Sequence, residues 1–217
     1  MKKQSIRDLE GTCKNNGNKM NMINKKQIKE FLEKHRDMDI SPAKMEYTLY
    51  LVPQIEEYAA EIAPKKETLE EMLFRSEIEA TEEPEKLVSL MRKYQCRKNT
   101  VLLREKLLAK EDSVFQLIQE KCITNMQDIF IENALRFFLY CEQNPTCWFL
   151  ENYGAFRSGY LKSMFCLIVG FRGEVDSVPF LISEAERFER MYPKESYDQG
   201  PMLAVSELLK RFKKEIK

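Results

Sequence analysis

The segment Phe156–Gly173 is the least polar stretch of an otherwise heavily charged chain, and no charged side chain interrupts it between Met164 and Phe171. Such a run cannot face water on any side, so the segments before and after it must cover it. Its apolar residues recur at three- and four-residue steps, and Gly173 stands where the end of a helix is expected. We therefore predict a buried helix that is a centre of packing and carries no chemistry of its own.

The composition favours an all-α fold. Of the 217 residues, 43% are hydrophobic and 32% are charged, whereas glycine and proline occur only 7 and 8 times. Long helices suit this balance better than a strand-rich fold, which needs many tight turns. Apolar residues recur at helical spacing along most of the chain, and the connections between the periodic segments are short. Successive helices joined in this way pack as antiparallel neighbours.

The chain divides into an arm and a domain. Residues 11–24 contain five asparagines and two glycines with few apolar groups, so we predict a flexible arm over residues 1–24. Residues 25–217 are predicted to form a single α-helical repeat domain. Within it, Ser41-Pro42 is typical of a helix start, and Pro53 interrupts the helix that follows. One apolar face continues across Pro53, which predicts a kinked helix or two abutting helices carrying Met45, Leu49, Val52, Ile55, Ala59 and Ile62.

The segment Gln127–Phe138 carries a resemblance to a known family. It opens with an aspartate and places apolar, alanine and apolar residues at Phe130, Ala134 and Phe138. In this it resembles the second helix of a HEAT repeat, and the resemblance extends over residues 83–212. The family implies a right-handed superhelix of antiparallel helix pairs, an α-solenoid, whose second helices line a concave surface that binds other macromolecules.

The pair of helices from Tyr160 to Phe188 is similar to a HEAT repeat as well, with Leu167 and Gly170 in its first helix and Val178-Pro179-Phe180-Leu181 after a short turn. The buried helix would then be the first member of a repeat pair. We expect it to lie between the aromatic segment around Trp148 and the helix of Leu181–Phe188.

Charge and hydropathy bear on partners and location. Lysine plus arginine and aspartate plus glutamate both number 35, which gives no net charge. A protein that holds a nucleic-acid backbone usually carries a basic excess, so this balance weakens a nucleic-acid role without excluding it. The first residues contain no apolar signal segment, and the run at 164–171 is far shorter than the roughly 20 residues of a membrane-spanning helix. We expect a soluble, cytoplasmic protein that does not enter a membrane.

The cysteines lack the spacing of about two to four residues that zinc sites favour. Most of them lie within apolar helical patterns, and free cysteine behaves as a small hydrophobic residue. We therefore predict buried free thiols in a reducing compartment, with no metal, cofactor or disulfide, at Cys13, Cys96, Cys122, Cys141, Cys147 and Cys166.

The residues that common catalytic sites require are scarce. His35 is the only histidine, and its charged neighbours place it on a solvated helix end. The histidines that nucleophilic triads and histidine metal sites require are therefore not available. Gly170–Gly173 follows no strand and is better explained as a helix end than as a phosphate loop. We expect no enzymatic activity. An enzyme that uses carboxylates alone stays open, and it would be recognised by two acids converging in a closed pocket.

Two groups of residues are candidates for a partner surface. Glu132 and Arg136 would face the concave groove in the HEAT-like register. The second group is a tyrosine-bearing loop near Pro193, which would otherwise simply close the last helical pair, and it comprises Tyr192, Tyr197, Asp198 and Gln199.

The leading hypothesis is a non-enzymatic scaffold that binds another protein through a solenoid surface. The alternative is a nucleic-acid-binding or DNA-repair protein of HEAT-like form. It would require the basic residues between positions 92 and 110 to gather on one concave face, namely Arg92, Lys93, Arg97, Lys98, Arg104 and Lys106.

Overall fold

A computed structural model describes residues 67–93 and 97–212. Within these ranges the chain forms nine α-helices and one short 3₁₀ turn, with no strand, which confirms the predicted all-α class for this part. The arm over residues 1–24, His35 and the helices expected between residues 25 and 62 lie outside it. The elements are α3 (Leu69–Ala80), α4 (Pro84–Leu90), α5 (Arg97–Leu108), α6 (Glu111–Thr124), α7 (Asp128–Tyr140), α8 (Thr146–Asn152), α9 (Gly159–Arg172), η3 (Val175–Ser177), α10 (Val178–Met191) and α11 (Gln199–Arg211).

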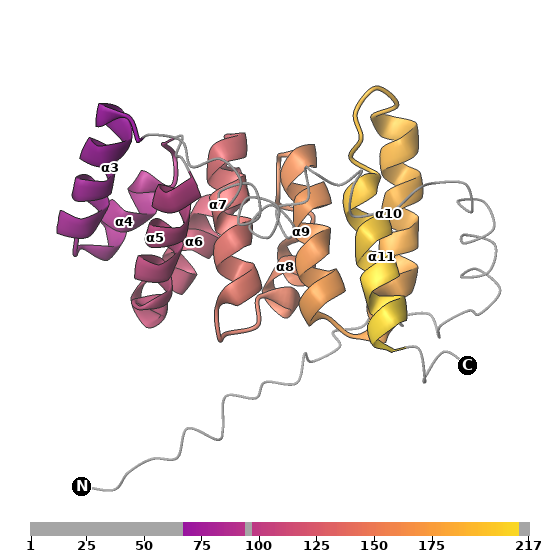
Figure 1. Cartoon of the computed structure of the whole chain (residues 1–217). Helices are drawn as coiled ribbons and strands as arrows, with labels where there is room; N and C mark the ends of the chain where they lie inside the picture. The colour runs from indigo at the N-terminus through magenta and orange to yellow at the C-terminus, as the bar shows by residue number, and fades with distance from the viewer. Residues whose placement is uncertain (1–66, 94–96, 213–217) are drawn as a thin grey trace, which may run out of the picture.

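The helices are arranged in two rows. Figure 1 shows α3, α5, α7, α9 and α11 side by side, from indigo at one end to yellow at the other, with the even-numbered helices behind them. Each helix of the first row packs against the next one in that row, and α4 packs against α6 in the second row. The buried side chains between the rows form one continuous core.

The uncharged segment identified in the sequence is helix α9, and its residues 163–170 are all buried. Ser158 begins the helix, because its hydroxyl accepts a hydrogen bond from the backbone N–H of Leu161 at 3.0 Å. Gly173 ends it, as the sequence predicts. Phe165 projects from α9 into a cluster of aromatic rings, with its centroid 5.8 Å from both Phe138 and Phe149. The prediction of a central packing helix is thus confirmed.

The closest neighbour of α9 is α11. A Cβ atom at Gly170 would lie 2.5 Å from the Cα of Ala204, and one at Gly200 would lie 2.0 Å from the carbonyl oxygen of Ser163. Two helices can approach this closely only where small residues meet. The sequence predicted that α9 lies between the aromatic segment around Trp148 and the helix of Leu181–Phe188. On the second side this is corrected, because the backbone contact of α9 is most extensive with α11.

Basic side chains in the last turns of first-row helices bind the carboxy-terminal end of the preceding helix in that row. Lys106 of α5 donates to the carbonyl of Ile78 at the end of α3. Arg172 of α9 donates to the carbonyls of Phe138 and Cys141 at 2.8 and 2.7 Å. Arg211 of α11 repeats this arrangement on α9. These cations satisfy carbonyls that a helix end leaves unpaired and oppose the negative end of its dipole.

Three of the predicted free thiols are found as expected, buried at Cys122, Cys141 and Cys166. Burial raises the pKa of the Cys122 and Cys166 thiols well above the ordinary value, and it raises the pKa of Cys141 to about 11, so these groups stay protonated at neutral pH. Cys147 is disulfide-bonded, and for this residue the prediction of a free thiol is wrong. None of the described helices combines the length and the apolar character that crossing a bilayer requires.

Candidate functional site

The loop between α10 and α11 brings two tyrosines onto the start of α9. Tyr192 follows the last turn of α10, and Tyr197 precedes α11. The hydroxyl of Ser163 donates to the carbonyl oxygen of Tyr197 at 2.6 Å, which anchors the loop to α9. A Cβ atom at Gly159 would lie 3.2 Å from each of the two rings, so the missing side chain leaves the space in which they sit. The loop is therefore held in place at several points.

Tyr160 connects this loop with helix α7. Its hydroxyl donates to Oε1 of Glu132 at 3.1 Å, and its ring centroid lies 6.2 Å from that of Tyr197. The rings of Tyr192 and Tyr197 lie 5.2 Å apart at an interplanar angle of 60°. All three tyrosines are half-buried, so each shows part of its ring to solvent. We call these three rings, together with the carboxylates of Asp128, Glu132 and Glu195, the tyrosine surface.

Glu132 and Arg136 occupy different levels of this surface. The Glu132 side chain is 33% exposed, whereas that of Arg136 is only 14% exposed. The Arg136 guanidinium donates to Oδ1 of Asn133 at 3.2 Å and lies 3.8 Å from Oε2 of Glu132. The amide of Asn133 in turn donates to the carbonyl of Met91 at 2.9 Å. Arg136 thus lies beneath Glu132 and helps to hold its carboxylate in place. Of the two side chains, Glu132 is the one that is accessible to a partner.

Burial and nearby carboxylates raise the pKa values of Tyr160 and Tyr197. Burial raises the pKa of Tyr160, and the adjacent Glu132 raises it further. Burial also raises the pKa of Tyr197, to which Glu195 and Asp128 add. Both shifts favour the neutral phenol, since an anion would be poorly solvated and would face negative charge. Tyr160 and Tyr197 therefore present neutral hydroxyl groups among carboxylates.

Asp198 and Gln199 lie beside the tyrosine surface and begin α11. The carbonyl of Asp198 accepts a hydrogen bond from the backbone N–H of Met202 at 3.2 Å. Gln199 is exposed, and Asp198 is half-buried. The structure thus brings Tyr192, Tyr197 and Glu132 together through Tyr160, with Asp198 and Gln199 at the edge.

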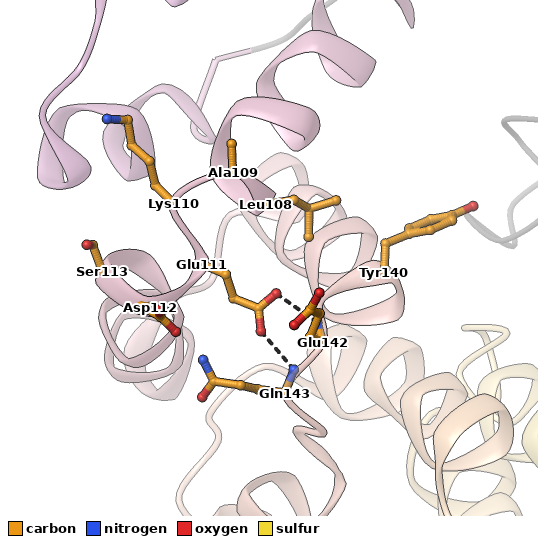
Figure 2. A pocket seen from close by; sticks show the side chains of 9 residues that line it. All are labelled: Leu108, Ala109, Lys110, Glu111, Asp112, Ser113, Tyr140, Glu142 and Gln143. Carbon is orange, nitrogen blue, oxygen red and sulfur yellow. Dashed lines mark hydrogen bonds between the residues drawn. The ribbon is translucent and has the colours of Figure 1, made fainter. Parts of the chain in front are cut away.

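A hollow of about 560 Å³ lies where α5 meets α6 and α7 ends. Figure 2 shows the Glu111 carboxylate pointing across it, and its two oxygens accept hydrogen bonds from the backbone N–H groups of Glu142 and Gln143, each at 2.7 Å. Lys110 pairs with Glu82 at 2.9 Å. Glu111 therefore joins the turn after α7 to the start of α6, with one backbone donor on each carboxylate oxygen.

A second polar cluster links the end of α8 to α10. The Tyr153 hydroxyl donates to a carboxylate oxygen of Glu184, and Arg187 donates to both oxygens of the same carboxylate. Burial raises the pKa of Tyr153, and the neighbouring Glu184 adds to the effect. Every member has a partner within the cluster, as expected of a buried polar link between helices.

Three of the six basic residues that favoured a nucleic-acid role contact other side chains of the protein. Lys93 lies 2.6 Å from Glu77, and Lys106 lies 2.8 Å from Glu82. The Arg104 guanidinium stacks on the ring of Tyr140 at 4.4 Å. The side chain of Arg97 lies outside the described part, whereas Arg92 and Lys98 are exposed.

The sequence interpretation missed the role of Tyr160. Its place in the apolar spacing of α9 indicated a core residue, yet its hydroxyl reaches Glu132 on another helix. The Gly159-Tyr160 pair at a helix start was the available signal, because a glycine there leaves room for a neighbouring ring.

In the described part of the chain, no three His, Cys, Asp or Glu side chains gather in a way that could hold a metal ion. No protein-family model, curated protein or solved structure matches the chain.

Proposed function

We propose that this protein is a non-enzymatic protein-interaction module that binds its partner through the tyrosine surface. The observation that carries the proposal is the cluster of three half-buried tyrosine rings, in which Tyr197 contacts Tyr160 in a tilted and Tyr192 in an edge-on arrangement beside Gly159. Tyrosine is enriched in the energetically dominant parts of protein interfaces, since it offers a large apolar ring and a hydroxyl on a short side chain. A ring already held in place loses little conformational entropy on binding.

The arrangement of the helices supports a HEAT-like α-solenoid as the framework of this module. First-row helices stack on each other in chain order, with second-row helices between them in sequence. In such an array, the exposed ends and faces of successive helices form an extended surface, which suits binding to macromolecules. The tyrosine surface draws on two consecutive members of the first row, α7 and α9, and on the loop that leads into α11.

The proposal is tested by quantitative capture from native extract with matched variants. The test variant is the double substitution Tyr192→Ala/Tyr197→Ala, and the control is Tyr140→Ala, which removes a tyrosine that is 47% exposed elsewhere on the protein. Far-UV circular dichroism and thermal melts first establish that both variants fold. A partner identified with the wild type should bind the control equally well and the double variant at least about tenfold more weakly.

Two results would count against this function. One is a partner whose affinity is the same for the wild type and the double variant, since the tyrosines would then lie outside the interface. The other is capture that disappears after nuclease treatment and weakens steeply with salt, which would indicate a nucleic acid as the true ligand.

A further inference from the structure

Helix α3 stands at one end of the first row and carries an apolar stripe that no described residue covers. Leu69 is 71% exposed, Met72 46% and Leu73 63%. These residues are spaced by three and four positions, so they lie on one side of the helix. The helix itself is well formed, because Thr68 and Glu71 make a reciprocal capping box at its start. Within the described part of the chain, α5 is its neighbour in the row.

The opposite end of the row is built differently. Helix α11 buries its apolar residues against α9 and α10, and its outward positions are polar at Ser206, Glu207 and Lys210. Stacked helical arrays need a polar outer face on their terminal members, because the last helix has no neighbour beyond it. By this criterion α11 has the surface of a terminal helix, whereas α3 has the surface of an internal helix.

Two buried acceptors at the same end also lack donors. Oδ1 of Asn99 and Oε1 of Glu67 accept no hydrogen bond within the described residues, although Asn99 is only 1% exposed. The other end of the Asn99 amide donates to the carbonyl of Glu71 in the first turn of α3, and Oε2 of Glu67 binds Arg75. Buried polar atoms in folded proteins are nearly always paired, so these acceptors indicate that donors are missing beside α3.

We propose that residues 42–62 of this chain pack on the apolar stripe of α3 and complete the helical array. This segment carries one apolar stripe at helical spacing, formed by Met45, Leu49, Val52, Ile55, Ala59 and Ile62. It also contains the hydroxyl and amide donors that the unpaired acceptors require, among them Tyr50, Gln54 and Tyr58. Only residues 63–68 separate it from α3, and connections this short make consecutive helices antiparallel neighbours.

Hydrogen exchange of the full-length chain tests this contact. The test variant is Leu73→Lys, and the matched control is Met126→Lys, because Met126 is 61% exposed on another part of the surface. In the wild type and the control, backbone amides of residues 42–62 should exchange much more slowly than in an unstructured peptide. In Leu73→Lys this protection should fall at least about tenfold while α9 stays protected, since local contacts open without global unfolding. The melting temperature should drop by about 5 °C in Leu73→Lys and by less than about 1 °C in the control.

A substitution within residues 42–62 tests whether this segment is the one that covers the apolar stripe of α3. Leu49→Lys should reproduce the loss of protection and the lower melting temperature, and the double variant Leu49→Lys/Leu73→Lys should melt no lower than either single variant, because both remove the same contact. The proposal is overturned by wild-type exchange at the rate of an unstructured peptide over residues 42–62, or by protection there that is indifferent to Leu73→Lys. It is also overturned if the wild type is a dimer that Leu73→Lys converts to monomers in light scattering, because a second copy would then cover α3.

Discussion

Substitution of Gly170 by alanine should destabilise the protein by separating α9 from α11. The added Cβ would lie 2.5 Å from the Cα of Ala204 and 2.9 Å from its Cβ, where carbon atoms need well over 3 Å. Relief requires movement of one helix backbone, and forcing extra carbon into a packed core costs about 1–3 kcal/mol. Alanine regains about 0.5–1 kcal/mol through its better helix propensity. The net loss at the upper end of this range is about 2 kcal/mol, which lowers the melting temperature by roughly 4–8 °C.

The control for this experiment is Gly154→Ala. Nothing lies within 4 Å of a Cβ atom at that position, so the substitution should be neutral or stabilise the protein by up to about 1 kcal/mol through the unfolded state. Thermal melts and guanidinium unfolding of both variants give the comparison directly. A Gly170→Ala protein as stable as Gly154→Ala would refute the close approach of α9 and α11.

Three further predictions concern the core, a helix end and acid stability. Replacing the fully buried Leu167 with aspartate should cost more than about 4 kcal/mol and abolish cooperative unfolding of the carboxy-terminal half in circular dichroism, because it buries an unpaired charge. Arg211→Met should cost about 1 kcal/mol in chemical denaturation by removing two 3.0 Å hydrogen bonds to the carbonyls at the end of α9, whereas Lys210→Met, which loses only a surface ion pair, should be neutral. Lys106 and then Lys110 lower the pKa of Glu82 to about 2 from an ordinary 4.5, so the stabilisation it provides is present above pH 4.5 and is lost as the pH falls toward 2. The small difference in melting temperature between the wild type and Glu82→Gln should therefore vanish over that range.

Helix positions could be predicted from the sequence because each amphipathic segment carries its own periodic signal. The end of α9 illustrates this, since Gly173 was predicted to terminate the helix and does so, whereas its start lies at Gly159 after the Ser158 cap and not at Phe156. Helix partners were harder to predict. The contact of α9 with α11 depends on Gly170 meeting Ala204 and on Gly200 meeting Ser163, and no local pattern indicates which small residues will face each other.

The tyrosine surface could be predicted only in part, because no local pattern indicates which residues of different helices and loops will meet. Tyr192 and Tyr197 stood out in the sequence as loop residues, and the structure places them on one surface with Glu132. Tyr160, the residue that connects them, lies within an apolar helix pattern. The spacing of apolar residues indicates on which side of a helix a residue lies, but it does not indicate which group its hydroxyl contacts. The disulfide state of Cys147 likewise could not be predicted from the spacing of the cysteines.

Site-specific photo-crosslinking tests the proposed interaction surface most directly. A benzophenone amino acid at the exposed Gln199, at the edge of the tyrosine surface, is compared with the same group at the exposed Glu120 on α6. The account predicts a discrete protein adduct from position 199 that is absent from position 120 and is lost when Tyr192→Ala/Tyr197→Ala is introduced alongside it. Identical adducts from both positions, or an adduct at position 199 that survives loss of the two tyrosines, would contradict it.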